Sequence, residues 1–270
     1  MTERHAIGRV RHALRRRLLT VTATERLTPN MLRITLAGSD LAGFVSAGYD
    51  DHVKLCFPGP GEGSPVWPAV GPDAVPLAEG VVASPMRDFT PRRYDADKGE
   101  LLIDFAVHEA GPASDWATNA VPGSRLGVGG PRGSFVVADD FDWYLLIGDE
   151  TALPAIGRRL EELRTGPRAI VIGAVTGAAE EQSFTSCADL DVRWLHRPLA
   201  AASDTAPWLA ALSALTLPDG DGYVWIAGET NVAKALRKVL VEERGVPRAW
   251  IKSAGYWRHG SAGFHESHGD

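Results

Sequence analysis

Residues 144–155 read Tyr-Leu-Leu-Ile-Gly-Asp-Glu-Thr-Ala-Leu-Pro-Ala, and two patterns follow each other within them. The first four residues form a continuous apolar run, which is typical of a strand buried on both faces of a parallel sheet. A polar turn comes next. Apolar residues then recur at helical spacing until Gly166 and Pro167 end the pattern: Leu153, Ile156, Leu160 and Leu163. This stretch therefore predicts one strand–turn–helix unit.

The same alternation continues toward the C-terminus. Two further apolar runs, 169–175 and 223–227, predict buried strands, and residues 192–195 predict a weaker one. Thr230 or Asn231 can cap a second helix. The apolar face of this helix consists of Val232, Leu236, Val239 and Leu240. Such alternation predicts a parallel sheet that binds ligands at the carboxyl ends of its strands.

The first half of the chain differs, because short β-like runs alternate there with Gly and Pro turns. These runs are 18–24, 31–36, 52–57, 101–107 and 125–128. Their spacing favours an antiparallel barrel or sandwich. The Gly- and Pro-rich stretch 58–76 is interpreted as a long loop. We therefore predict an antiparallel β-barrel over residues 1–139 and a parallel-sheet, nucleotide-type α/β domain over residues 140–270.

The 270 residues carry a formal net charge of -6, which gives nucleic-acid binding no global electrostatic support. Cys56 and Cys187 are far apart and form neither a disulfide framework nor a metal-ligand set, so a reducing, cytoplasmic environment is expected. No apolar segment approaches the roughly 20 residues of a membrane span. The basic residues 15–17 precede an apolar run too interrupted for an export signal. We expect a monomer without integral membrane association and without a bound metal.

Residues 86–90 read Met-Arg-Asp-Phe-Thr and place an arginine, an aromatic ring and a hydroxyl group along one extended segment. On a strand, Arg87 and Phe89 face the same side. Such a set can hold a flavin, because the guanidinium binds phosphate, the ring stacks and Thr90 can form a hydrogen bond near the redox edge. A solvated basic strand explains the same residues, and spacing alone favours that simpler interpretation.

Residues 104–117 run from a predicted strand through Gly111 and Pro112 into a predicted short helix. A helix N-terminus presents free N–H groups that suit a pyrophosphate, and Ser114 can add a hydroxyl donor. An ordinary capped helix, with His108 as a hydrogen-bonded core residue, is an equally good interpretation.

The polar turn 148–152 lies at the carboxyl end of the first parallel strand, where open α/β sheets bind their ligands. Thr151 can reach a cofactor ring from this turn, whereas Asp149 and Glu150 can equally serve as plain helix-capping charges. No dinucleotide fingerprint accompanies the turn. The glycines of segment 127–133 resemble one, but Arg132 replaces its last glycine and a strand-like segment follows, so we reject it.

These blocks belong to a longer series of motifs that spans about residues 10–260. The series is Met86-Arg87-x-Phe89-Thr90-x-Arg92-Arg93, Asp104-Phe105-x-x-His108-x-x-Gly111-Pro112-Ala113-Ser114-x-Trp116-Ala117, Gly129-x-Pro131-Arg132-Gly133, Gly148-Asp149-Glu150-Thr151-Ala152-Leu153-Pro154-Ala155, Ala227-Gly228-Glu229 and Gly255-Tyr256-Trp257-Arg258. In this order the motifs resemble the siderophore-interacting protein family, also known as ferric-siderophore or ferric-chelate reductases. Several blocks in register are far more specific than any one alone.

The resemblance implies a ferredoxin-reductase-like architecture, in which an FAD-binding barrel precedes a pyridine-nucleotide-type domain. The implied FAD site consists of Arg87, Asp88, Phe89, Thr90, His108, Gly111, Pro112, Ala113, Ser114 and Thr151. The implied electron donor is NAD(P)H, with ferredoxin as an alternative. The nucleotide is expected near Gly148, Asp149, Glu150, Thr176, Gly228 and Glu229. The family usually has Tyr where this chain has Phe89, so stacking is kept and a hydroxyl hydrogen bond is lost.

The implied activity is reduction of a ferric siderophore, with FAD rather than a protein acid–base pair as the redox centre. Siderophore oxygens are hard and anionic and hold Fe(II) poorly, so reduction releases the iron. A polyanionic substrate is expected to meet basic residues, with Lys54 and Arg132 as the main candidates and Lys252 and Arg258 as weaker ones. Solvated surface charge is the alternative for each. Two other functions stay open: another flavin oxidoreductase of this architecture, and a non-catalytic siderophore-binding protein.

Overall fold

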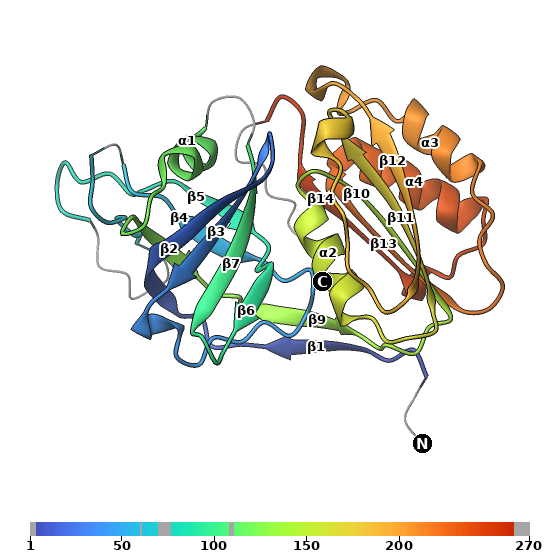
Figure 1. Cartoon of the computed structure of the whole chain (residues 1–270), viewed down its shortest axis with the longest axis horizontal. Coiled ribbons are helices and arrows are strands. Elements are labelled where there is room, and N and C mark those ends of the chain that lie inside the picture. The colour runs from blue at the N-terminus through green and yellow to red at the C-terminus, as the bar shows by residue number, and fades with distance from the viewer. Residues whose placement is uncertain (1–3, 60, 70–76, 108–110, 262–270) are drawn as a thin grey trace. The chain divides into compact units, whose positions relative to one another are not determined.

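The computed structural model describes residues 4–59, 61–69, 77–107 and 111–261. The chain divides into two compact units. The antiparallel unit is Ile7–Val136, and the parallel unit comprises the other described residues, 4–6 and 137–261. The first described residues therefore join the second half of the chain. His5 stacks on Phe141 there, with 4.2 Å between ring centroids. Figure 1 shows the elements of both units.

A seven-stranded antiparallel sheet forms most of the antiparallel unit, in the order β5-β4-β8-β2-β3-β7-β6. Its strands are β2 (Arg16–Thr28), β3 (Met31–Ala37), β4 (Val53–Cys56), β5 (Met86–Phe89), β6 (Arg93–Asp95), β7 (Glu100–Ala106) and β8 (Arg125–Gly129). The strands β1 (Ile7–Arg11) and β9 (Gly133–Val137) pair as a separate two-stranded sheet. Helix α1 (Pro112–Asn119) follows β7 and packs against β7 and β3.

The alternation of side chains explains how this sheet encloses a core. In β3, Leu32, Ile34 and Leu36 are buried, whereas Arg33 and Thr35 between them are half-buried. Because successive side chains of a strand point to opposite faces, this period of two places one apolar row inside. Each fully buried side chain of this size stabilises the fold by about 1.5–3 kcal/mol.

A five-stranded parallel sheet forms the centre of the parallel unit, in the order β12-β11-β10-β13-β14. Its strands are β10 (Trp143–Asp149), β11 (Arg168–Val175), β12 (Asp189–His196), β13 (Gly222–Glu229) and β14 (Ile251–Trp257). The three central strands are almost wholly buried, as their continuous apolar runs predict. The strand order reverses between β10 and β13, so the carboxyl ends of these two strands border the crevice where such sheets bind ligands.

Helices cover both faces of the parallel sheet (Figure 1). They are α2 (Leu153–Glu162), α3 (Ala206–Ser213) and α4 (Thr230–Glu242). Trp208 of α3 and Leu236 of α4 share one core cluster with Leu145 of β10. On the opposite face, the Arg159 guanidinium of α2 lies over the Tyr144 ring, 4.8 Å from its centroid. The predicted order of an antiparallel and then a parallel sheet is confirmed.

Two features differ from the sequence prediction. Helix α3 was not predicted, because its residues Ala-Pro-Trp-Leu-Ala-Ala-Leu-Ser are apolar on nearly every side and show no amphipathic period. The predicted cap of α4 is wrong. Glu229, rather than Thr230 or Asn231, caps this helix: its carboxylate accepts from the backbone N–H of Asn231 at 2.7 Å and of Val232 at 3.1 Å.

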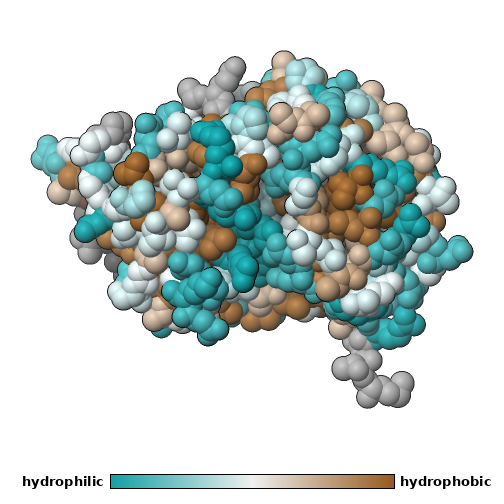
Figure 2. All heavy atoms as spheres, in the orientation of Figure 1, coloured by the Kyte–Doolittle hydropathy of each residue, from teal (hydrophilic) through white to brown (hydrophobic). Residues whose placement is uncertain are grey.

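The face of the molecule seen in Figure 2 is mixed, with groups of apolar residues among hydrophilic and intermediate ones. Within the described ranges, no helix has the length and apolar character needed to cross a membrane.

Candidate cofactor sites

The first predicted cofactor motif lies on β5, an edge strand of the antiparallel sheet. Arg87 pairs in register with Leu55 and Phe89 pairs with Val53, so both side chains lie on the core-facing side of β5, as the strand period predicts. The half-buried Arg87 guanidinium donates to the Met86 carbonyl oxygen at 2.8 Å, its one hydrogen bond within the described residues. Its other N–H groups are available to an anion.

Thr90 follows β5 and is 7% exposed. Its hydroxyl group has no hydrogen-bond partner in the described parts of the chain. The oxygen atom itself is not fully buried, so it can form a hydrogen bond with water or with a ligand. Thr90 therefore suits the predicted role of a hydrogen-bonding contact to a cofactor.

Aromatic rings connect β5 to helix α1. The Phe89 ring packs against Phe105 of β7 with 4.5 Å between centroids and against Phe57 with 6.3 Å. Trp116 of α1 lies 5.8 Å from Phe105 and 5.9 Å from Phe57. The first and second predicted motifs thus meet in one cluster of rings, in which Phe89 and Trp116 pack against the buried Phe57 and Phe105.

The N-terminus of α1 has features that a phosphate site can use. Gly111 precedes the helix, Pro112 occupies its first turn, and the N-cap position provides no side-chain cap within the described residues. Ala113 packs on the core, and Ser114 beside it is half-buried. The free N–H groups and the helix dipole favour an anion here. His108, the remaining residue predicted for this motif, lies outside the described residues.

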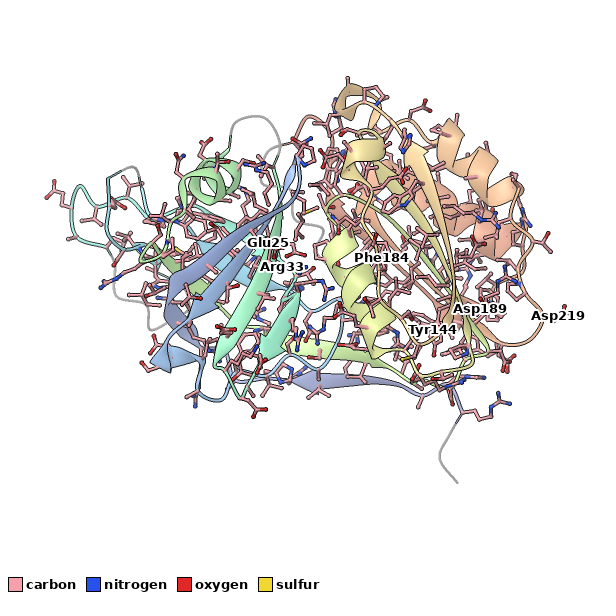
Figure 3. The ribbon with its side chains drawn as sticks, viewed as in Figure 1. Glu25, Arg33, Tyr144, Phe184, Asp189 and Asp219 are labelled. Atoms are coloured by element: carbon pink, nitrogen blue, oxygen red, sulfur yellow. The ribbon has the colours of Figure 1, made fainter. Side chains whose placement is uncertain are left out.

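Asp104 lies on the face of the sheet opposite the apolar core, in register with Arg33. Its carboxylate accepts two hydrogen bonds from the Arg33 guanidinium, at 2.7 Å and 2.8 Å, and lies 3.8 Å from the Arg92 guanidinium. Figure 3 labels Arg33 on its strand. Asp104 thereby joins β3 and β7 to the segment that follows Thr90. This buried ion pair was not predicted from the sequence.

The two basic candidates of the antiparallel unit differ in their surroundings. Lys54 pairs with Asp88 at 2.7 Å between Nζ and Oδ1, so a neighbouring carboxylate offsets its charge. Asp88 points away from the core and is exposed, unlike its neighbours on β5. Arg132 is exposed and its guanidinium has no partner within the described ranges. Arg132 is therefore the stronger candidate for a contact with an anionic substrate.

In the parallel unit, Asp149 ends β10 and is 1% exposed. One of its carboxylate oxygens accepts from the Thr151 N–H at 3.0 Å and from the Thr151 hydroxyl at 2.6 Å. The other accepts from the Glu229 N–H at 2.9 Å and from the Trp257 indole at 2.8 Å. Asp149 therefore fixes Thr151 and the ends of two other strands, and its oxygens are taken up by protein donors.

Glu150 forms a buried ion pair with Arg197, at 2.7 Å between Oε2 and Nη2. Burial and the neighbouring Asp149 charge raise the pKa of Glu150 to about 7, although Arg197 acts in the opposite direction. This carboxyl group thus titrates near neutral pH at the edge of the sheet where a ligand is expected.

The other residues predicted at the nucleotide site lie at the same sheet edge. Gly148 leaves room for the Ala152 side chain. Gly228 has a φ of +140° and leaves room for the Asp149 carboxylate, because a Cβ atom at position 228 would lie 2.5 Å from that carboxylate. Thr176 directly follows β11 and is half-buried. The two weaker basic candidates are also in the parallel unit: Lys252 lies within β14 and is half-buried, and Arg258 just beyond it is exposed.

The donor set of the antiparallel unit fits FAD. A flavin dinucleotide combines a planar ring system with a pyrophosphate, and the unit offers an arginine, an open helix N-terminus, an unpartnered hydroxyl and an aromatic rim. By contrast, no cluster of three or more His, Cys, Asp and Glu side chains that could hold a metal ion occurs within the described residues.

A curled antiparallel sheet with this donor set, followed in the chain by a five-stranded parallel sheet, defines a ferredoxin-reductase-like protein. The ferredoxin reductase of carbazole 1,9a-dioxygenase shares the fold at 17% identity and a TM-score of 0.61, over 88% of this chain and 66% of that chain. More particularly, the chain belongs to the siderophore-interacting protein family. Residues 20–135 match the siderophore-interacting FAD-binding domain, and residues 141–260 match the siderophore-interacting protein domain.

Two members of this group are similar over nearly their whole length. The NADPH-dependent ferric-chelate reductase of Escherichia coli K12 is 38% identical, over 92% of this chain and 95% of the relative. The crystal structure of a siderophore utilization protein from T. fusca is 41% identical with a TM-score of 0.87, over 96% of this chain and 99% of that chain.

Sequence reasoning missed a structural feature of the rejected glycine segment. Gly127 and Gly129 lie on β8, in an antiparallel sheet, which confirms that they form no dinucleotide fingerprint. The two glycines make room for the indole of Trp67, which also lies under the Arg16 guanidinium at 5.4 Å. An alternating Gly-x-Gly pattern on a strand was the available signal, because glycines leave space for a ring to pack closely on the strand.

Proposed function

We propose that this protein is an FAD-dependent oxidoreductase that reduces ferric siderophores and so releases Fe(II) for iron acquisition. One observation carries the proposal: Phe89 of the first motif and Trp116 of α1 both pack on the Phe105 ring, in a unit that matches a siderophore-interacting FAD-binding domain. The similarity to an NADPH-dependent ferric-chelate reductase supports the reaction type.

In this proposal, the chain's own residues bind and orient the cofactor. Arg87 and the first N–H groups of α1 hold the phosphates, Thr90 forms a hydrogen bond to the ring system, and Phe89 supports that ring from the core side. His108 and Thr151 are further proposed contacts. Bound FAD supplies the ability to accept a hydride from a donor and to pass on single electrons.

The proposed substrate is a ferric siderophore, whose anionic oxygens hold Fe(III) much more tightly than Fe(II). A basic surface would attract such a complex and raise its local concentration. Arg132 is the main proposed contact because its charge is unpaired within the described residues, and Lys54 is secondary because Asp88 offsets its charge. Lys252 and Arg258 are weaker candidates.

The proposed electron donor is NADPH or NADH, bound at the carboxyl edge of the parallel sheet. Asp149 and Glu229 use their carboxylates on protein donors, so we assign nucleotide contacts first to Thr151 and Thr176 and to the backbone around Gly148 and Gly228. Ferredoxin is an alternative donor. We further propose a cytoplasmic monomer.

The decisive experiment mixes the purified protein anaerobically with NADPH, a ferric siderophore and a ferrous chelator that changes colour. We expect a yellow protein containing FAD and the appearance of the ferrous complex. A colourless protein that binds the chelate without forming Fe(II) would instead indicate a binding protein. Rapid NADPH oxidation with dyes or free flavin, without preference for ferric chelates, would indicate another flavin oxidoreductase.

The site assignment has its own matched test. Arg87→Ala should weaken FAD binding about tenfold or more, because a charge-assisted hydrogen bond contributes about 1.5–3 kcal/mol. Arg125→Ala is the control, since Arg125 is an exposed arginine of the same unit whose one side-chain hydrogen bond within the described residues is to the Ser64 hydroxyl, at 3.1 Å. Equal flavin content in both variants would count against the role of Arg87.

A further inference from the structure

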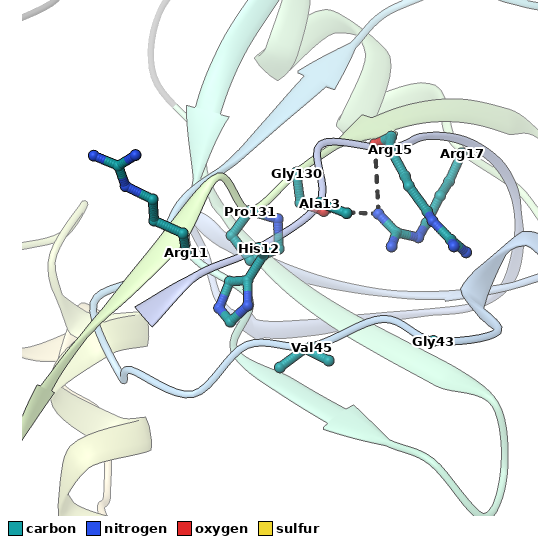
Figure 4. A pocket seen from close by; sticks show the side chains of 9 residues that line it. All are labelled: Arg11, His12, Ala13, Arg15, Arg17, Gly43, Val45, Gly130 and Pro131. Atoms are coloured by element: carbon teal, nitrogen blue, oxygen red, sulfur yellow. Dashed lines mark hydrogen bonds between the residues drawn. The ribbon is translucent and has the colours of Figure 1, made fainter. Parts of the chain in front are cut away.

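A cavity of about 260 Å³ opens in the antiparallel unit, beside the connection from β1 to β2. Figure 4 shows Arg15 and Arg17 on one side of it, His12 on the other and Val45 below, whereas the Arg11 side chain extends away from these residues. Gly130 and Pro131 complete its wall, and none of the lining residues carries a carboxylate. The cavity is therefore lined by positive charge, although the whole chain is acidic.

Arg17 is the central observation, because its side chain is a buried cation without an anionic partner. The residue is 4% exposed. Its guanidinium donates to the carbonyl oxygens of Asp40 at 3.0 Å and Gly130 at 2.7 Å and lies 5.0 Å from the Phe44 ring centroid. No carboxylate of the described residues lies within ion-pair distance of it. Burial, followed by the charge of Arg15, lowers the pKa of Arg17, although the Asp40 charge opposes this.

Arg11 and Arg15 add to this unbalanced charge. Both are exposed, and neither guanidinium has a hydrogen-bond or ion-pair partner in the described parts of the chain. Arg15 also borders Gly43, with its Nη1 atom 3.8 Å from the point that a Cβ would occupy there. Adjacent like charges destabilise each other, and an anion in the cavity would relieve the repulsion.

Hydrogen bonds through Ser134 to Asp51 hold the His12 side chain in place. Its Nε2 atom lies 2.7 Å from the Ser134 hydroxyl, which in turn donates to the buried Asp51 carboxylate at 2.6 Å. Because the Ser134 proton is directed to Asp51, the Nε2 atom of His12 donates an N–H to Ser134. This chain of hydrogen bonds fixes the imidazole at the cavity wall.

The cavity and the proposed FAD motif belong to the same sheet, in which β8 is two strands and β2 three strands from β5. Arg16 of β2 pairs with Gly129 of β8, Gly129 pairs with Lys54 of β4, and Lys54 pairs with Asp88 of β5. Neighbouring strands are about 4.8 Å apart, so β8 and β5 are about 10 Å apart along this row. Gly130, in the cavity wall, directly follows Gly129.

We propose that this cavity is an anion subsite for an oxyanion of carboxylate or phosphate size, and that it holds an anionic group of the ferric siderophore during reduction. The substrate role rests on the proposed function, whereas anion binding by the cavity does not. The volume is below the roughly 300–1,000 Å³ of a typical small-molecule site, so the subsite takes one group rather than a whole chelate.

The test compares Arg15→Ala with Arg26→Ala, which removes an exposed arginine from the far end of β2. For each full-length protein, the Tm in sulfate is compared with the Tm in chloride at the same ionic strength. This increase in Tm should be about 2 °C larger for the wild type and the Arg26 variant than for the Arg15 variant. An equal increase in Tm on replacing chloride with sulfate in all three proteins would overturn the anion subsite.

Kinetics then separates the substrate from a free anion. Arg15→Ala should raise KM for a polyanionic tris-catecholate ferric complex about tenfold, with kcat and the KM for an uncharged tris-hydroxamate unchanged. Sulfate should compete with the catecholate in the wild type and in the Arg26 variant, but not in the Arg15 variant. An unchanged catecholate KM would overturn the substrate role and leave a site for free anions. If Fe(II) forms from none of the ferric chelates, the proposed function is rejected. The sulfate measurement would still decide whether the cavity binds an anion.

Discussion

The indole Nε1 of Trp257 donates a hydrogen bond of 2.8 Å to the Asp149 carboxylate, across 108 positions of sequence. Asp149 ends β10 and Trp257 ends β14, and the same carboxylate oxygen accepts the N–H of Glu229 at the end of β13. One buried side chain therefore joins three strand ends at the edge of the sheet where ligands are expected.

Asp149→Asn should destabilise the protein by about 2–4 kcal/mol, because the amide keeps one acceptor oxygen and turns an N–H2 group toward two of its former donors. Trp257→Phe removes only one of the four hydrogen bonds and should cost about 1–2 kcal/mol. Urea unfolding of both variants measures these losses. A loss for the Asp149 variant no larger than that for the Trp257 variant would show that the bonds to Thr151 and Glu229 contribute nothing.

Stability should depend on pH through Glu150, whose pKa rises from the usual 4.5 to about 7 on folding. Between these two values the folded protein binds the proton more tightly than the unfolded chain, so this group's contribution is fully present below pH 4.5 and is lost as the pH rises through 7. Glu150→Gln should remove this dependence. The wild-type minus variant difference in unfolding free energy should therefore fall between pH 5 and pH 8. A constant difference would contradict the assignment.

The N-terminus of α4 offers a comparison between two neighbouring residues. Glu229→Ala should cost about 1–2 kcal/mol, because its carboxylate caps the helix at the N–H groups of Asn231 and Val232. Asn231→Ala, at the position that sequence rules favour for a cap, should change stability by less than about 0.5 kcal/mol. Thermal unfolding of the two variants checks the order, and the reverse order would restore the sequence prediction.

The packing of the Trp67 indole on β8 can be tested by substituting two glycines of this strand. A Cβ at Gly127 would lie 2.7 Å from the Trp67 ring, whereas one at Gly129 would lie at an ordinary 3.4 Å. Gly127→Ala should therefore displace the indole and cost about 1–3 kcal/mol, with a shift in tryptophan fluorescence. Gly129→Ala is the matched control and should leave the spectrum unchanged. Identical spectra for both variants would show that the indole is not seated on β8.

The sequence predicted the central strands of the parallel sheet well, because burial on both faces leaves continuous apolar runs such as 144–147. It did not predict β14, whose pattern is only partly buried, or the short strands β1 and β6. Local periodicity carries little signal for elements that are short or border solvent on one side.

In the candidate sites too, features with a local sequence signal were predicted and features that depend on tertiary packing were not. The motif around Arg87 was recognisable because its residue types already suit a flavin. The partners that set the electrostatics were not: Arg197 is 47 positions from Glu150, and Arg33 is 71 positions from Asp104. Such pairs follow from tertiary packing, which a single sequence does not reveal. The anionic partner of Lys54 was overlooked although Asp88 was itself a predicted site residue.

The position of His5 has a practical consequence for dissecting this chain. Its imidazole bonds Asp140 at 3.0 Å and Asp221 at 2.9 Å, and its backbone N–H lowers the pKa of Asp140. A fragment that starts at residue 137 lacks His5, so the Phe141 ring would be uncovered and the two carboxylates would lose the residue that both of them contact. A short peptide with the first six residues, supplied in trans, should bind that fragment and restore what the cut removed.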